Sequence, residues 1–184
     1  MMLKGNAMSA RDRSEAFGPD SPLYRPPGHF FRGGLGRFAT GVAVVTFRGD
    51  QGNHGITINS FTSVSMDPPL VLASIGRNAK SHDLLFDRPF SINILGAEQE
   101  KVAWQFAGRP NHEPTWIEGD TAPRLAGTLS WFECMPWANY DGGDHTLFLG
   151  EVVDHDYRKG DYLGFIAGKF VTITDPDAWD QPLI

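Results

Sequence analysis

Cysteine is almost missing from this sequence, because Cys134 is the only one in 184 residues. A lone cysteine excludes an internal disulfide, and we therefore expect a protein of the reducing cytoplasm. Cys134 lies in the apolar segment LSWFECMPW, which predicts a buried, inert thiol rather than a nucleophile. Long hydrophobic runs are missing as well, and no stretch is long enough to span a membrane. The polar N-terminal residues lack the apolar centre of a secretory signal, so we expect no leader there.

Positive charge is also scarce. The chain has 16 Lys and Arg against 22 Asp and Glu, which gives a formal net charge of −6. This balance argues against a nucleic-acid partner, which needs a basic surface. A negative protein that binds an anion must gather its cations locally, and Arg77 and Lys80 are the candidates for that role. The length fits one domain, and an apolar fraction of 41% is normal for a globular protein.

Common catalytic motifs are absent too. The sequence contains no Gly-x-Ser-x-Gly, no Walker lysine and no His-Glu-x-x-His. The glycines at 33, 34 and 36 have the wrong spacing for a dinucleotide fingerprint, and no expected strand precedes them. Four histidines in expected turns or loops have no Cys or His partner at metal-ligand spacing, so we predict no metal site: His54, His82, His112 and His155.

Short apolar segments rich in β-branched residues and separated by turn formers predict a mainly β protein, most simply a barrel. The strands are expected at 41–47, 54–65, 70–75, 90–95, 123–137, 146–157 and 162–173, with a hairpin turn at 48–53 and a loop at 139–144. Helices are expected at 78–86 and 97–107. With Asn78 as N-cap, the first-turn N–H groups of the helix at 78–86 suit a phosphate. Residues 1–27 are polar and predict a flexible arm in front of a domain at 28–184.

Residues 54–81, HGITINSFTSVSMDPPLVLASIGRNAKS, are the most informative stretch. Hydroxyl and amide side chains alternate with apolar ones, a Pro-Pro pair and an apolar run follow, and a cationic loop ends the stretch. One interpretation is a shallow site for a flat polar ligand with an anionic tail, with Arg77, Lys80 and Ser81 at the anion. The other is the wet face of an edge strand followed by a solvated turn. Residue types alone leave both open.

The amino-acid sequence of this stretch resembles that of a known family. GITINSFTSVSMDPPLVLASI is similar to the signature of the flavin-reductase-like, FMN-binding split-barrel family. FATGVAVVTFRG (38–49) resembles the opening strand of that family, FSINILG (90–96) its middle strand, and GDHTLFLGEVVD (143–154) its late Gly-Asp-His strand. The resemblance runs from about residue 31 to about residue 174. It implies a mainly β fold, an FMN-binding split β-barrel of Greek-key type with a few short flanking helices. One of these helices is implied at 28–41, and a variable covering loop at 111–119.

The resemblance also implies an activity. Members of this family pass hydride from NADH or NADPH to FMN or FAD. The resemblance therefore predicts that this chain is a reductase that supplies reduced flavin to a partner monooxygenase. The two cofactors perform this chemistry themselves, so we expect no catalytic acid or base. A flavin-binding protein without reductase turnover, an oxidase of the pyridoxamine-phosphate type and a sensor for another cofactor remain alternatives. The sequence does not separate FMN from FAD or NADH from NADPH.

The site residues that the resemblance implies fall into groups along the flavin. Its isoalloxazine edge and ribityl chain are assigned to Thr57, Asn59, Ser60, Phe61, Thr62 and Ser63. Its ribityl and phosphate end is assigned to Ser74, Ile75, Arg77, Lys80 and Ser81. His145 is placed beside the nicotinamide, and its alternative role is to cap a strand. The alternative for Arg77 is an ion pair with Asp83 or Asp87.

Aromatic residues are plentiful, with 13 Phe, 5 Trp and 4 Tyr. Together with the apolar strands, they exceed what the interior of one small barrel should need. The family covers such surface with a second copy of the chain, so we expect a homodimer with flavin sites near the subunit boundary.

Overall fold

The computed structural model describes residues 27–176. The chain divides into two compact units, and the larger one, Thr40–Phe165 with Phe170 and the residues after it, carries nearly all of the sheet structure. The smaller unit contains helix α2 (Pro27–Leu35) and the segment Ile166–Lys169. Within it, the backbone N–H of Ala167 donates to the carbonyl of Gly36 at 2.8 Å.

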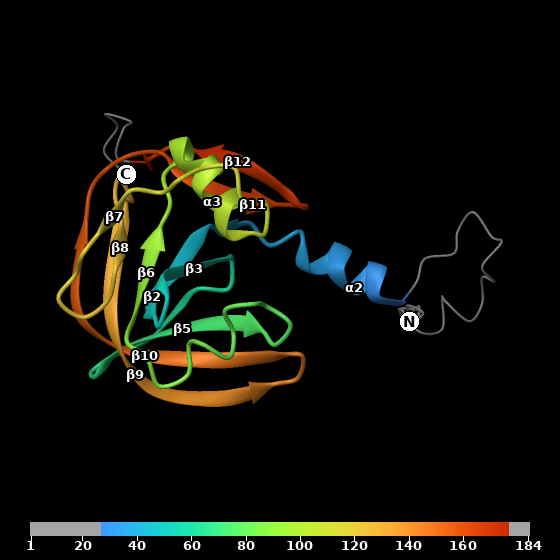
Figure 1. Ribbon diagram of the computed structural model, residues 1–184. Helices are drawn as coiled ribbons and strands as arrows, with labels where there is room; N and C mark the ends of the chain where they lie inside the picture. Colours follow the sequence, from blue (N-terminus) through green and yellow to red (C-terminus); the bar gives the residue numbers. More distant parts are fainter. Residues whose placement is uncertain (1–26, 177–184) are drawn as a thin grey trace, which may run out of the picture. The chain divides into compact units, whose positions relative to one another are not determined.

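One antiparallel sheet of seven strands forms the body of the larger unit, in the order β3-β2-β6-β9-β10-β5-β4 (Figure 1). Its strands are β2 (Ala43–Gly49), β3 (Gly52–Ile58), β4 (Thr62–Met66), β5 (Pro69–Gly76), β6 (Phe90–Ile94), β9 (Ser130–Gly142) and β10 (His145–Tyr157). Two small sheets complete the fold: β1 (Thr40–Gly41) with β11 (Tyr162–Ile166) and β12 (Lys169–Ile173), and β7 (Trp116–Ile117) with β8 (Arg124–Leu125). The expected mainly β, split-barrel-like fold with few short helices is confirmed.

Strand β2 explains why the segment GVAVVTF is continuously apolar. Side chains alternate between the two faces of a strand. Ala43, Val45 and Phe47 lie in one hydrophobic core, whereas Val42 and Val44 lie in a second core. A strand between two cores has no wet face, so the usual alternation of apolar and polar residues disappears.

The lone thiol lies in the first of these cores. Cys134 has no exposed surface, and burial raises its pKa to about 12. A thiol that stays protonated is a poor nucleophile, so the expectation of a buried cysteine is confirmed.

The long hairpin of β9 and β10 curves around the sheet, and its strands run side by side in Figure 1. Register shifts at Leu149/Gly150 and Val152/Asp154 mark bulges, which bend a strand and increase its twist. The loop expected at 139–144 is wrong, because both strands continue until His145 pairs with Gly142. Gly143 allows the tight turn by adopting a positive φ of 79°.

Two further expectations about strands are corrected. The strand expected at 54–65 is two strands, because pairing stops between Ile58 and Thr62. At this break the hydroxyl of Ser60 donates to the carbonyl of Ser74 at 2.7 Å and replaces a ladder contact. The last strand, expected at 162–173, is the hairpin β11–β12, which turns at Ala167 and Gly168 with positive φ values of 50° and 81°.

The segment expected at 123–137 as one strand also divides, into the short β8 and the start of β9. Between them, the backbone N–H of Leu129 donates to the carbonyl of Ile94 at 2.9 Å.

The helix expected at 78–86 does not form. Residues 77–87 are a series of turns in which His82 N–H donates to the Ala79 carbonyl and Leu85 N–H to the His82 carbonyl. The phosphate site at a helix N-terminus is therefore wrong, although this segment still presents backbone N–H groups.

The helix expected at 97–107 is confirmed as a short 3-10 turn, Ala97–Gln99, followed by α3 (Glu100–Phe106). Helix α2 overlaps the first part of the segment 28–41, where the family resemblance implied a helix. The flexible arm expected at 1–27 lies outside the described residues except for Pro27, which begins α2.

The segment expected as a variable loop, 111–119, leads into residues that are anchored on the sheet. The carboxylate of Glu133, itself buried, accepts the Thr121 N–H at 2.8 Å and pairs with Arg124 at 3.1 Å. The guanidinium of Arg124 also lies 3.7 Å from the centroid of the Trp131 ring. A buried carboxylate needs partners of this kind, so the second half of the connection is held in place.

Among residues 27–176, no helix is long and apolar enough to cross a membrane. The same residues contain no group of three or more His, Cys, Asp or Glu side chains placed to hold a metal ion.

Candidate functional site

A cleft of about 630 Å³ opens between three segments of the larger unit. They are the middle of β3, the turns after β5 and the end of α3 with the residues that follow it. Its lining consists of Gly55, Ile56, Thr57, Asn78, Ala79, Lys80, Ser81, Gln105, Phe106, Ala107, Gly108 and Pro110. The volume lies in the range that small-molecule and cofactor sites occupy.

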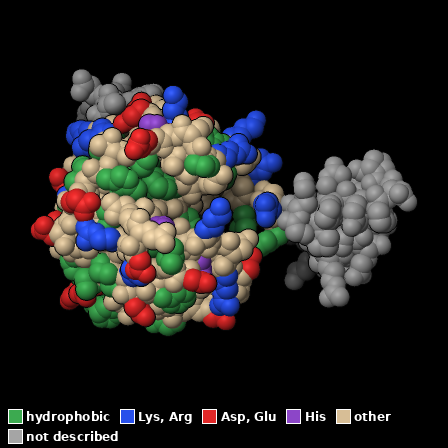
Figure 2. All heavy atoms as spheres, in the orientation of Figure 1, with side chains coloured by type: hydrophobic (Ala, Val, Ile, Leu, Met, Phe, Trp, Pro, Cys, Tyr) green, Lys and Arg blue, Asp and Glu red, His purple; other side chains and the backbone are tan. Residues whose placement is uncertain are grey.

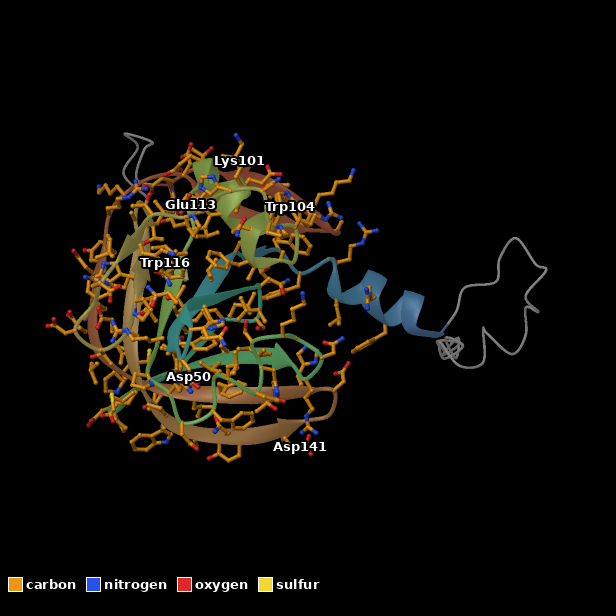
Figure 3. All side chains as sticks on the ribbon, viewed as in Figure 1. Asp50, Lys101, Trp104, Glu113, Trp116 and Asp141 are labelled. Carbon is orange, nitrogen blue, oxygen red and sulfur yellow. The ribbon has the colours of Figure 1, made fainter. Side chains whose placement is uncertain are left out.

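The floor of the cleft is joined to α3 by close contacts. The hydroxyl of Thr57 donates to the carbonyl of Ala103 at 2.7 Å. A Cβ added to Gly55 would lie 2.5 Å from the Phe106 ring, so the absence of a side chain at 55 lets this ring approach the strand. Helix α3 is therefore fixed against β3, and Figure 3 shows Trp104 on this helix.

The opposite wall is polar and basic. Lys80 is exposed, Ser81 is half-buried beside it, and both line the cleft. Among the described lining residues, Lys80 is the only charged one. An ammonium group, a hydroxyl and turn N–H groups are the donors that a phosphate accepts from.

This wall is joined to the tip of the β9–β10 hairpin. The Arg77 N–H donates to the Asp144 carbonyl at 2.9 Å, and the Arg77 guanidinium pairs with Asp141 at 3.0 Å. Figure 3 shows Asp141 at this tip, where its carboxylate also accepts the Gly143 N–H at 2.7 Å. The suggested partners of Arg77, Asp83 and Asp87, are therefore not the ones it has.

His145 begins β10 directly after this tip and pairs across the sheet with Gly76. Its Nδ1 lies 2.7 Å from a carboxylate oxygen of Asp144. This hydrogen bond, and then the charge of the ring, hold the pKa of Asp144 below its usual range. A Cβ at Gly76 would lie 3.1 Å from Asn78 Oδ1 and 3.6 Å from His145 Nε2, so the Asn78 side chain is the closer neighbour of this glycine.

The other sequence-predicted flavin residues do not line this cleft. Ser60 and Ser74 are brought together, and the Ser60 hydroxyl donates to the Ser74 carbonyl and accepts from the Ser74 N–H. The Ile75 side chain is 1% exposed in the core, which leaves only its backbone for a ligand. Phe61 stacks on Phe132 with ring centroids 5.7 Å apart. Three exposed residues complete this group: Asn59, Thr62 and Ser63.

Sequence reasoning missed the wall that α3 contributes. The helix at 97–107 was expected, but nothing local in the sequence indicates that Phe106 on this helix meets Gly55. Gln105, Gly108 and Pro110 also line the cleft, because α3 and the residues after it pack beside β3. The signal that could have found them is the glycine at 55, since a glycine inside a strand often marks a close approach.

The chain is similar in sequence to a known domain family and to several characterised proteins. Residues 35–174 match the profile of the flavin reductase like domain. The FMN reductase (NADH) SmoA of Agrobacterium fabrum is 40% identical over 159 residues, which cover 83% of this chain and 91% of that protein. The reductase component of the 4-nitrophenol 4-monooxygenase/4-nitrocatechol 2-monooxygenase of Rhodococcus opacus is 34% identical over 144 residues, with coverage of 76% and 78%.

A solved structure is similar along most of the chain. It is an NADH:FAD oxidoreductase of Streptomyces globisporus in complex with NAD and FAD fragments. The TM-score is 0.72 and the identity 40%, over 80% of this chain and 93% of that one.

Proposed function

The chain belongs to the flavin reductase like family, and from that membership we propose that it reduces FMN or FAD with NADH. The observation that carries this proposal is the cleft at β3, whose basic wall is hydrogen-bonded through the Arg77 N–H to Asp144, the residue directly before His145. The cleft proposed for flavin and the His145 imidazole proposed for the nicotinamide are thereby linked through the same hairpin. A reaction between two cofactors requires that both be oriented by one framework.

The residues present fit a flavin. Lys80 and Ser81 offer a charge and a hydroxyl to its phosphate, while Ile56 and Phe106 offer apolar surface to its ring. When both are bound, the reduced nicotinamide supplies hydride to the flavin, and this chemistry belongs to the cofactors. The work left to the protein is to bind and to orient.

His145 orients the nicotinamide in this proposal. Its Nδ1–H donates to Asp144, which fixes the rotation of the ring and leaves Nε2 for the ligand. The assignment of the remaining residues, Asn59 to Ser63 and Ser74 with Ile75, stays a prediction. Their positions outside the lining favour indirect roles for them, such as shaping the turn at 59–61.

The product of such a reaction is free reduced flavin. Because the Rhodococcus opacus relative is named as the reductase component of a monooxygenase, we infer that this chain also serves a separate monooxygenase. We place it in the cytoplasm, since its single cysteine cannot form an internal disulfide.

A homodimer is the further part of the proposal, and the outer face of the sheet supports it. Leu72, Leu149 and Ala138 form one row across β5, β10 and β9. Their neighbours in sequence Ala73 and Phe148 are buried in the core, so the row points outward.

Further apolar side chains surround this row. Met135, Trp137, Tyr140 and Val153 are each about half exposed, and Figure 2 shows apolar side chains at the surface among charged ones. The pair of His145 and Gly76 lies on the same outer face, so a second copy seated there would border the nicotinamide site.

Light scattering tests the dimer. We expect a mass near twice the 20.3 kDa of one chain at micromolar concentration. A mass near one chain, with flavin bound, would contradict both the dimer and a site bordered by the second copy.

The activity is tested by following NADH oxidation at 340 nm with FMN and FAD added in turn, and with NADPH as a second donor. We expect oxidation that depends on added flavin and produces peroxide in air. Binding of flavin without NADH oxidation would identify a carrier instead of a reductase.

A further inference from the structure

His82 is the buried ionisable side chain next to the cleft that binding and hydride transfer leave unexplained. It follows Ser81 in sequence and is 6% exposed. Its ring lies edge-on to Phe86 and Phe148, with centroid distances of 5.3 and 5.7 Å. A polar ring in such a shell costs free energy unless its nitrogens are hydrogen-bonded.

Both nitrogens have partners. Nδ1 lies 2.6 Å from a carboxylate oxygen of Asp83, and Nε2 lies 2.8 Å from the hydroxyl of Thr146. Because a carboxylate only accepts, Nδ1 carries a hydrogen, and Nε2 and the Thr146 hydroxyl form the second hydrogen bond of the ring. This arrangement has the order of a nucleophilic triad, but Thr146 is 6% exposed and its hydroxyl is inaccessible to a substrate. The contact is therefore a tie between two segments.

The segments that it joins are the two halves of the site. His82 directly follows Ser81 on the basic wall, and Thr146 directly follows His145 on β10. At the other end of the same turns, Arg77 N–H donates to the Asp144 carbonyl. Residues 77–82 are thus attached to the β9–β10 hairpin at both ends, once at the exposed tip and once inside the core.

We propose that His82 is a positioning residue for flavin reduction. Through Thr146 it holds the turns that carry Lys80 and Ser81 in one register with His145. The phosphate end of the flavin and the nicotinamide are then bound by a single rigid unit. The roles of Lys80 and His145 in this inference rest on the proposed function.

Removing the Thr146 hydroxyl tests the tie without touching either ligand-binding group. Thr146→Val keeps the shape of the side chain but leaves His82 Nε2 unpaired, whereas Thr146→Ser retains the hydroxyl. We expect Thr146→Val to weaken flavin binding and raise the KM for NADH about tenfold, because the turns lose their fixed position relative to β10, and Thr146→Ser to stay within about twofold. Amide hydrogen exchange of residues 77–82 should accelerate in the valine variant alone.

Thr128→Val is the matched control. Thr128 is 7% exposed, and its hydroxyl donates to the Leu125 carbonyl at 3.4 Å, in a turn outside the cleft lining. The Thr128→Val variant loses an equally buried threonine hydroxyl. An effect that comes only from lower stability should therefore appear in this variant as well. Flavin titration and exchange of residues 77–82 should match wild type in this variant.

A double variant separates position from stability. His82→Phe with Thr146→Val leaves neither partner of this hydrogen bond with an unpaired polar atom, so its melting temperature should recover toward wild type. Flavin affinity and the KM for NADH should stay as weak as in Thr146→Val, because the register is still unspecified. If the single valine variant does not fold, the double variant is compared with wild type, and its flavin affinity should still be about tenfold weaker.

Affinity that recovers with melting temperature, or a Thr146→Val protein that binds flavin like wild type, would overturn the positioning role. These results are distinct from failure of the proposed function. A wild type that binds flavin but does not oxidise NADH would overturn that function, while titration and exchange would still report on the tie.

Discussion

Lys80 is the residue that offers a full positive charge to a ligand in the cleft. A charged hydrogen bond to phosphate contributes about 1.5–3 kcal/mol, so Lys80→Ala should weaken flavin binding by that amount. Flavin titration measures it, with Lys101→Ala as control, since Lys101 is exposed on α3 and does not line the cleft. Arg77→Ala should cost less, because Asp141 already pairs with the Arg77 guanidinium. Unchanged affinity in both the Lys80 and Arg77 variants would exclude the phosphate assignment.

His145 should matter for the nicotinamide and not for the flavin. His145→Ala should slow hydride transfer or raise the KM for NADH, with flavin affinity near wild type. His155→Ala is the control, since His155 lies near the other end of the same strand and stacks on Phe132. Stopped-flow reduction of bound flavin decides: loss of flavin with normal reduction of the remaining complex would refute this role.

The pair of Asp144 and His145 has its own signature in pH. The pKa of Asp144 is lowered by the hydrogen bond from His145 and by the charge of its ring. A carboxylate with a lowered pKa stabilises the fold above its unfolded pKa and loses that contribution as the pH falls through the folded value. In His145→Ala, an NMR titration should show the Asp144 pKa moving up toward the ordinary value. An unmoved pKa would mean that another group causes the shift.

At the scale of elements, α3 packs closely on β3 because Gly55 has no side chain in the way of the Phe106 ring. Gly55→Ala places a Cβ 2.5 Å from the Phe106 ring, so we expect a loss of about 1–3 kcal/mol in the free energy of unfolding and a weaker flavin site. Phe106→Leu in the same chain relieves the clash and should restore part of both. Denaturant unfolding and flavin titration measure the pair. Equal stability of wild type and Gly55→Ala would show that α3 is free to shift.

The turns at 77–87 illustrate why an element can be misjudged. Their composition suits a helix, but His82 is tied to Thr146 and Arg77 to Asp141, and these distant partners hold the segment in turns. Tertiary hydrogen bonds override a weak local propensity in this way.

At the scale of the whole molecule, this chain is expected to reduce flavin and to do nothing further to an organic substrate. The proposed hydride transfer needs only the two cofactors, and the cleft lined by Thr57, Lys80 and Ser81 is the one that we assign to flavin. With NADH, flavin and oxygen, the purified chain should form peroxide and leave a phenolic substrate unchanged, as chromatography would show. A hydroxylated product from the purified chain would contradict this division of labour.

The strands, the buried thiol and α3 could be predicted because their signals are local. Runs of β-branched residues bounded by glycine and proline indicate where the chain forms β-strands. The spacing of apolar residues indicates which face of a strand or helix is buried. The site residues had a different source: Thr57 and His145 were implied by the family resemblance, and Lys80 and Ser81 were suggested by their residue types as well. The structure brings Thr57, Lys80 and Ser81 to one cleft.

Only the tertiary structure decided which side chains meet. Thr57 contacts a carbonyl 46 residues away, and His82 a hydroxyl 64 residues away. The first of these pairs depends on how α3 packs against β3, and the second on the register of β10 against β5, and neither leaves a local periodicity in the sequence. The sequence by itself therefore determined the fold class and the chemical inventory of the site. Register and packing decided that Arg77 faces Asp141 and that α3 walls the cleft.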